Sequence, residues 1–121
     1  MPIATKAQIL AADDRPTEKV ETPEWGEGAF VLVRSLSASE RDRFEQSMIE
    51  ERGKSTRANL ENIRGRFAAL CVVGEDGERL FTDAEARDLG QKSAAVLDRI
   101  FGIAQRLNGM SSDDVEELAG N

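Results

Sequence analysis

Residues 71–85 constrain the fold of this chain more than any other segment. An apolar run stops at Gly74, and Asp76-Gly77 follows as a tight-turn pair because glycine takes positive φ at no steric cost. Thr82 and Glu85 then have the spacing of a capping box, in which a hydroxyl and a carboxylate satisfy the free amides of a new helix. The segment therefore predicts the end of one element, a turn and a helix start, and it holds no evident chemistry.

Apolar residues at steps of three and four predict helices on both sides of this turn. Ser37 and Glu40 form a second capping-box pair, and Gly53 is a suitable helix end. Gly65, inside one predicted helix, either permits close helix packing or is merely tolerated. The predicted helices cover residues 38–53, 56–72, 82–89, 93–107 and 113–118.

Two extended segments precede these helices, at about residues 18–25 and 29–36, with Gly26-Glu27-Gly28 as a hairpin loop. A lone two-stranded hairpin is marginal in water, so Trp25, Phe30 and Leu32 are expected to lean on the helices. The predicted fold is mainly α, in the α+β class: an N-terminal β-hairpin packed on a bundle of about four to five helices. Residues 1–17, with a short helix at 3–12, are expected to form an arm, and residues 18–121 a single domain.

The composition excludes several function classes. Sixteen Lys and Arg against 23 Asp and Glu give a net charge of −7, which disfavours a nucleic acid as partner. The chain has no histidine, the commonest general base and metal ligand, and its one cysteine, Cys71, sits in an apolar run typical of a buried residue. We therefore expect no enzymatic activity, no metal and no cofactor. The lack of a long apolar run or a secretion signal predicts a cytoplasmic protein without membrane contact.

Charged runs have a simpler interpretation than a catalytic site. Residues 40–45 alternate acidic and basic side chains, which favours a solvated helix face with local ion pairs over a pair of catalytic carboxylates. Arg57, Arg64 and Arg66 likewise favour a helix surface over a nucleic-acid site.

The order of short sequence blocks resembles the tail assembly chaperones of long-tailed, siphovirus-type bacteriophages and prophages. The resemblance covers about residues 18–121 and contains no catalytic signature. The blocks are the Trp25-Gly26 hairpin, the strand and helix start at 33–42, Arg66 to Val73, Asp76-Gly77 with Leu80-Phe81-Thr82, Leu89, the 100–108 stretch and Ser111.

This resemblance implies a non-enzymatic role in viral morphogenesis within the infected or lysogenic bacterial host. Members of the family bind the aggregation-prone tape measure protein, help recruit tail tube protein, and are absent from the mature virion. A longer product made by −1 ribosomal frameshifting is common, and Ala119-Gly120-Asn121 is compatible with a slippery codon run, or with a simple helix end. The alternative is another phage structural or adaptor protein, such as a head–tail connector or a minor tail subunit.

Trp25 and Phe30 are the residues we expect at a partner-binding surface, because large aromatic side chains often anchor interfaces. The competing interpretation is that both pack onto the helices. Self-association into a homo-oligomer is left open by the sequence.

Overall fold

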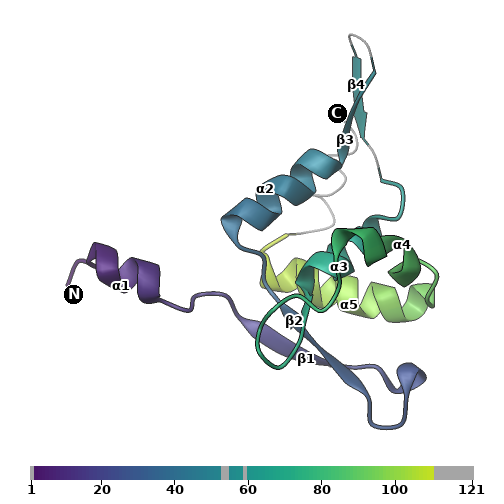
Figure 1. Cartoon of the computed structure of the whole chain (residues 1–121), viewed down its shortest axis with the longest axis horizontal. Helices are drawn as coiled ribbons and strands as arrows, with labels where there is room; N and C mark the ends of the chain where they lie inside the picture. The colour runs from purple at the N-terminus through teal and green to yellow at the C-terminus, as the bar shows by residue number, and fades with distance from the viewer. Residues whose placement is uncertain (1, 53–54, 59, 111–121) are drawn as a thin grey trace.

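The computed structural model of the chain describes residues 2–52, 55–58 and 60–110. They form an α+β fold in which a three-stranded antiparallel sheet packs against helices (Figure 1), which confirms the predicted fold class. The elements are α1 (Lys6–Ala11), β1 (Thr17–Glu21), η1 (Pro23–Trp25), β2 (Phe30–Arg34), α2 (Ala38–Ser47), β3 (Ile49–Arg52), β4 (Ser55–Ala58), α3 (Ile63–Cys71), β5 (Val72–Val73), η2 (Asp83–Glu85), α4 (Ala86–Leu89) and α5 (Ala94–Leu107).

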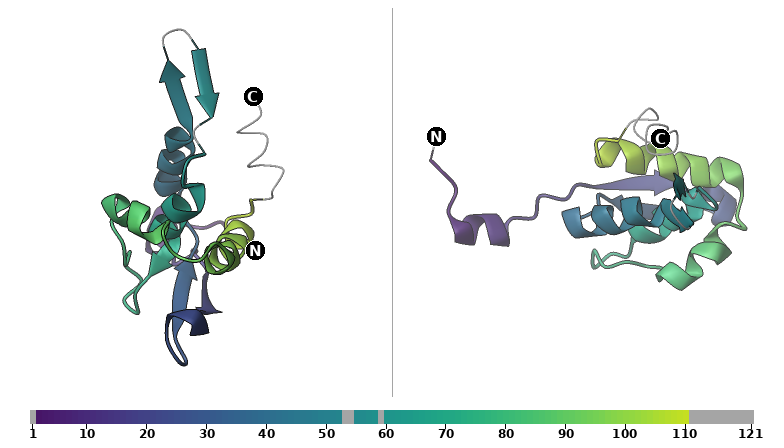
Figure 2. Two further views of the ribbon diagram at one scale, coloured as in Figure 1. Left: turned by 90° about the vertical axis from the view of Figure 1, so that its right-hand side faces the viewer. Right: turned by 90° about the horizontal axis from the view of Figure 1, so that it is seen from above.

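The predicted N-terminal hairpin forms two strands of the sheet. β1 and β2 pair antiparallel with Val20 opposite Val31, and β5 joins β2 with Val73 opposite Leu32. Helix α5 packs on β1 and β2, as the two views in Figure 2 show. The hairpin is therefore supported by the last long helix, which lies about 70 residues away along the chain.

The residues that anchor the hairpin differ from those expected. Val20 and Val33 are buried in the core, whereas Phe30 is 46% exposed and Trp25 is 36% exposed. Because side chains alternate along a strand, Phe30 and Leu32 share the face opposite to Val33. Trp25, Phe30 and Leu32, which were expected to lean on the helices, lie outside the core cluster, to which the hairpin contributes Val20 and Val33.

Both predicted capping pairs are present. The Glu40 amide donates to the Ser37 hydroxyl at 3.2 Å, and the Ser37 amide donates to the Glu40 carboxylate at 2.9 Å, which starts α2. At the next site, the Glu85 carboxylate accepts from the Thr82 amide at 2.9 Å and from its hydroxyl at 3.1 Å. This pair starts η2, which continues directly into α4.

Three phenylalanines, one from each of three helices, lie at the centre of the core. Phe44 of α2 stacks on Phe67 of α3 with ring centroids 4.6 Å apart. Phe67 meets Phe101 of α5 edge to face at 5.3 Å. Other fully buried side chains around them are Met48, Ile100, Val33, Val72, Val96 and Cys71. The apolar stripes predicted for these helices thus form one continuous core.

A second hairpin replaces the end of one predicted helix and the start of the next. β3 pairs antiparallel with β4, with Ile49 opposite Ala58. Helix α2 ends at Ser47 and α3 begins only at Ile63, so the predicted helical starts and ends near Gly53 and Thr56 were wrong. The polar segment between the helices lacks the alternation of apolar and polar residues that identifies a strand. The β3–β4 pairing therefore could not be predicted from the local sequence.

The junction between α3 and α4 explains Gly65. Asn62 adopts a left-handed conformation at φ 52°, and its side-chain amide donates to the Ala86 carbonyl at 2.9 Å. A Cβ on Gly65 would lie 2.5 Å from the Asn62 Oδ1 and 2.6 Å from the Ala86 carbonyl oxygen. Of the two interpretations left open, close helix packing is the one that the structure supports.

The predicted N-terminal helix is present as α1, closed by a capping box between Thr5 and Gln8. The boundary between an arm at 1–17 and a domain at 18–121 stays a prediction. The helix predicted at 113–118, and the Ala119-Gly120-Asn121 end, lie outside the described residues. The helices that the structure describes are all too short or too polar to cross a lipid bilayer.

Candidate functional site

The tip of the first hairpin presents Trp25 on a defined turn. The Thr22 amide donates to the Ala29 carbonyl at 2.9 Å, and the Ala29 amide donates to the Gly26 carbonyl at 2.9 Å. The Trp25 amide donates in turn to the Thr22 carbonyl at 2.9 Å, which closes η1. These bonds fix the backbone that carries Trp25, whose side chain remains partly exposed.

An arginine from the last helix holds this turn from outside the hairpin. Arg99 of α5 donates to the Glu24 carboxylate through two nitrogens, at 3.0 and 2.7 Å, and to the Glu21 carbonyl at 2.9 Å. The hydrogen bonds from Arg99 lower the pKa of Glu24 from its ordinary value to about 2, so the carboxylate stays ionised. This clamp fixes the residue that directly precedes Trp25.

Phe30 lies on the outer face of the sheet. In the β1–β2 register Phe30 is opposite Glu21, and Lys19 is opposite Leu32, so Lys19 and Phe30 are diagonal neighbours on one face. The Lys19 Nζ lies 4.5 Å from the centroid of the Phe30 ring, a cation–π contact. Together with half-buried Leu32, Phe30 gives this face an apolar centre.

The structure thus keeps Trp25 and Phe30 on the same hairpin, both outside the core. Both side chains are only partly exposed, so neither belongs to the buried core. Their role as partner contacts stays a prediction. We define Trp25, Phe30 and Leu32 as the hairpin surface.

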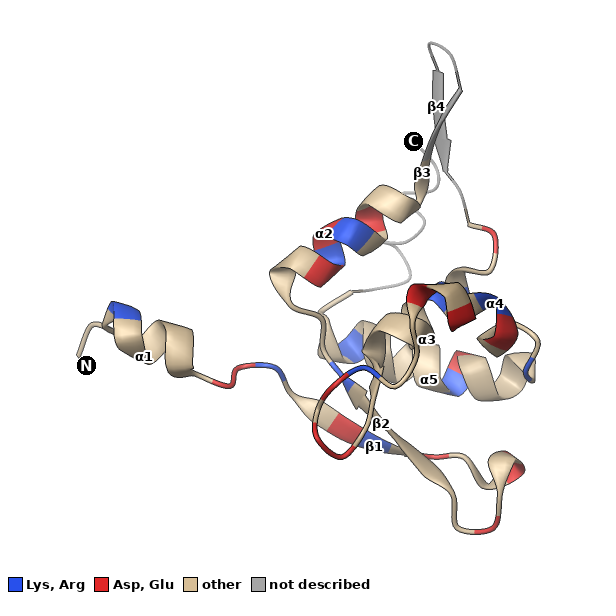
Figure 3. Ribbon diagram, in the orientation of Figure 1, with Lys and Arg blue, Asp and Glu red and all other residues tan. Residues whose placement is uncertain are grey.

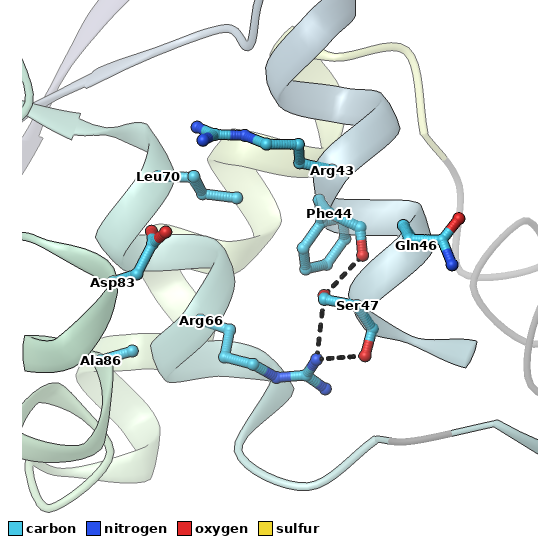
Figure 4. Close-up of a pocket in the computed structure, with 8 residues that line it drawn as sticks. All are labelled: Arg43, Phe44, Gln46, Ser47, Arg66, Leu70, Asp83 and Ala86. Carbon is cyan, nitrogen blue, oxygen red and sulfur yellow. Dashed lines mark hydrogen bonds between the residues drawn. The ribbon is translucent and has the colours of Figure 1, made fainter. Parts of the chain in front are cut away.

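A groove between α2, α3 and α4 was not anticipated from the sequence (Figure 4). Its volume is about 440 Å³, and Phe44, Leu70 and Ala86 contribute its apolar part. The other residues that line it are Arg43, Gln46, Ser47, Arg66 and Asp83. Helical periodicity identified Phe44 and Leu70 as core residues, but only the packing of the helices shows that a hollow remains beside them.

One wall of this groove is fixed by hydrogen bonds. Arg66 donates through Nη1 to the Ser47 carbonyl at 2.9 Å and to the Ser47 hydroxyl at 3.0 Å (Figure 4). The Ser47 hydroxyl donates to the Phe44 carbonyl at 2.6 Å, and Arg66 Nε donates to the Glu61 carbonyl at 3.0 Å. Burial lowers the pKa of Arg66 from its ordinary value. This arginine therefore links the end of α2 to α3.

Charged residues of both signs lie close together along α2 and α4 (Figure 3). On α2, Arg41 pairs with Glu45 at 3.1 Å, and Glu40 pairs with Arg15 at 2.9 Å. Ion pairs also join Arg64 to Asp98 and Arg106 to Glu18. Within residues 40–45 the structure thus has one local ion pair, Arg41 with Glu45, of the kind that the sequence predicted.

The lone cysteine is placed where a thiol does not react. Cys71 is fully buried, and burial raises the pKa of its thiol to about 12. The thiol therefore stays protonated at neutral pH and is a poor nucleophile. Within residues 2–52, 55–58 and 60–110, no group of three or more His, Cys, Asp or Glu side chains is placed to hold a metal ion.

The fold is similar to that of a solved phage protein. The structure described as "Structure of bacteriophage HK97 tail assembly chaperone" superposes with a TM-score of 0.59 at 17% sequence identity, and covers 88% of this chain and 95% of that chain. At this identity the match defines the class of fold. No curated protein sequence matches the chain.

The sequence itself defines the family. A family model described as "Phage tail assembly chaperone" matches residues 4–120, almost the whole length. The chain belongs to the phage tail assembly chaperone family, which confirms the resemblance recognised from its sequence blocks.

Proposed function

We propose that this chain binds the tape measure protein during phage tail assembly, keeps it soluble and helps recruit tail tube protein, without catalysing a reaction. Family membership supports a role in tail assembly. The observation that carries the binding proposal is the hairpin surface, on which large aromatic residues stay exposed while their backbone is held by the Arg99 clamp.

A rigid aromatic surface suits a partner that exposes apolar stripes. Trp and other aromatic side chains bury large areas at low entropic cost, and they are common anchors of interfaces. An amphipathic helix of the tape measure protein would lay its apolar face against the hairpin surface. The net charge of −7 would keep such a complex soluble while other apolar segments of the partner are still exposed.

Co-expression with the tape measure protein of the same phage tests this proposal. We expect the wild-type chain to raise the soluble fraction of the tape measure protein, and the double variant Trp25→Ala/Phe30→Ala to lose most of that gain. The matched control is Leu60→Ala/Leu80→Ala, which removes two other exposed apolar side chains, 41% and 56% exposed. No gain in solubility with the wild-type chain would contradict the proposal.

The same proposal places the chain in the host cytoplasm and outside the mature virion. Mass spectrometry of purified particles checks this: a chaperone is absent, whereas a head–tail connector or a minor tail subunit persists at a fixed copy number. Detection of the chain in particles would replace the chaperone role with that of a structural subunit.

A frameshifted longer form is also part of the proposal. The gene sequence at the Ala119-Gly120-Asn121 codons checks it, since a slippery heptamer and an overlapping −1 reading frame are both required. A non-slippery run of codons would remove this element and leave the binding role unaffected.

A further inference from the structure

One edge of the three-stranded sheet is open along β1. This strand pairs with β2 on one side and with no strand of the described residues on the other (Figure 1). At one end of the β1–β2 ladder the Ser35 amide donates to the Pro16 carbonyl at 3.0 Å. At the other end the Thr22 amide donates to the Ala29 carbonyl at 2.9 Å. Because hydrogen-bonded pairs alternate along antiparallel strands, the even-numbered residues of β1 bond to β2 and the odd-numbered ones direct their amides and carbonyls outward.

The outward backbone groups are available to another strand. They belong to Thr17, Lys19 and Glu21. Within the part of the chain that the structure describes, the amides of all three and the carbonyls of the first two accept or donate no hydrogen bond. The Glu21 carbonyl accepts from Arg99 at 2.9 Å. A row of donors and acceptors at strand spacing is satisfied by the backbone of an extended peptide, which is how β-strand addition works.

A groove lies beside this edge, between β1 and α5. Its volume is about 490 Å³, and all of the strand residues that line it, 18–21, come from β1. Arg99 and Ile103 contribute the α5 wall, and Pro23 closes one end. Val20 is buried and Ile103 is half-buried against the core. We define this hollow as the edge groove. A strand added to β1 would direct alternate side chains toward α5, where Ile103 offers an apolar contact.

The side chains of β1 select the chemistry of the added strand. Lys19 and Glu21 are exposed, and neither makes an ion pair within the described residues. Charged side chains on an edge strand discourage indiscriminate pairing, and opposite charges on facing residues stabilise a ladder. An antiparallel strand therefore matches β1 when a basic residue faces Glu21 and an acidic residue faces Lys19. The residue between these two faces Val20 on the α5 side and is best apolar.

We propose that the open edge of β1 binds an extended segment of another protein as an added antiparallel strand, with a basic, an apolar and an acidic residue opposite Glu21, Val20 and Lys19 in that order. The bound segment widens the sheet from three strands to four. This inference goes beyond the proposed function, because it assigns a second surface to a second class of segment. The hairpin surface takes a helix, the edge groove takes a strand, and each can be tested without the other.

A synthetic peptide tests the pattern on the full chain. N-acetyl-Lys-Val-Glu-Thr-Thr-amide, at millimolar concentration, is titrated into isotope-labelled protein, and hydrogen exchange of the amides is followed by NMR. We expect saturable binding that slows exchange severalfold at Thr17, Lys19 and Glu21. Much smaller changes are expected at Glu18 and Val20, whose amides already bond to β2. The absence of binding, or changes confined to the hairpin surface, would overturn the proposal.

The matched control peptide is N-acetyl-Glu-Val-Lys-Thr-Thr-amide. It has the same composition and net charge, but it places like charges opposite Glu21 and Lys19, so we expect its dissociation constant to be at least about fivefold higher. Equal affinity for the two peptides would contradict the proposed register. Exchange that slows at the outward amides when the protein alone is concentrated would assign the edge to a second copy of the chain, and would also overturn the proposal.

Two substitutions of Lys19 separate its backbone from its side chain. Lys19→Pro removes an outward amide and no β1–β2 hydrogen bond, and proline is accepted on edge strands. Lys19→Ala removes the same charge but keeps the amide. We expect Lys19→Pro to bind the first peptide at least about tenfold more weakly than Lys19→Ala, and equal affinities would contradict strand addition. If thermal melts show Lys19→Pro to be unfolded, methylation of the glutamate amide in the peptide gives the same test on the wild-type chain, with the same tenfold loss expected.

Discussion

Phe67 and Phe30 are the same amino acid in opposite settings. Phe67 is completely buried between Phe44 and Phe101, where it joins three helices. Phe30 is 46% exposed and contacts a lysine over one face of its ring. The helical core concentrates stability, whereas the hairpin leaves aromatic area available to a partner. Substitutions in the core and in the hairpin can test whether the core residues contribute most of the stability.

The largest difference is expected between Phe67→Ala and Phe30→Ala. Removing a buried phenylalanine typically costs about 3–5 kcal/mol, and Phe67 loses two aromatic contacts as well. Phe30→Ala loses a half-exposed ring and one cation–π contact, so we expect its cost to stay below about 1 kcal/mol. Urea denaturation of both variants measures the free energy of unfolding. Comparable costs for the two would show that the hairpin shares the stability of the core.

The α3–α4 junction gives the next largest effect. Gly65→Ala places a methyl group against a backbone carbonyl that cannot move aside, and overpacking of this kind costs about 1–3 kcal/mol. Gly102→Ala is its control, because a Cβ there meets nothing within 4 Å and the helix gains about 1 kcal/mol. Urea denaturation should therefore give shifts of opposite sign. A stabilising Gly65→Ala would show that the junction opens at little cost.

A smaller gain is expected where the hairpin meets the core. Thr22 is fully buried, and its hydroxyl has no hydrogen-bond partner within the described residues. Thr22→Val keeps the shape and removes the unpaired hydroxyl, so the free energy of unfolding should rise by about 1 kcal/mol. Thr22→Ser keeps the hydroxyl and loses a methyl group, and it should destabilise. Thermal melts of the two variants show whether the buried hydroxyl destabilises the fold. A Val variant less stable than wild type would mean that the Thr22 hydroxyl makes a hydrogen bond in solution.

Local signals predicted the parts of the fold that neighbouring residues determine. The pairs Ser37 with Glu40 and Thr82 with Glu85 act over three residues, and the stripe from residue 94 to 107 repeats within one helix. The capping pairs and the apolar stripe could therefore be predicted from the sequence without tertiary information. The presence of the first hairpin was predicted for the same reason, since β-branched and aromatic residues flank a glycine-containing loop.

Contacts between distant segments were missed because they leave no local pattern. Val72 and Val73 look like the end of a helix, but pairing with Val33 and Leu32 of β2 draws them into the sheet. The face of Phe30 was misjudged because register decides it, and a one-residue shift exchanges the buried and exposed faces. The groove depends on how three helices pack, so it had no sequence signature.

The smallest expected effect concerns the clamp that holds the exposed hairpin to α5. The pKa of Glu24 is about 2 in the folded chain against an ordinary 4.5, so ionised Glu24 favours folding above pH 4.5, and this contribution is lost as the pH falls toward 2. Glu24→Gln should therefore melt slightly below wild type at pH 7, and the gap should shrink between pH 4.5 and pH 2.

Glu27→Gln is the matched control for this last comparison. It makes the same charge change in the same turn, and no ion pair of Glu27 is present within the described residues. Its melting temperature should follow that of wild type across the whole pH range. No gap between Glu24→Gln and wild type at any pH would mean that Arg99 holds the hairpin through the Glu21 carbonyl alone, and that the charge of Glu24 does not help to position Trp25.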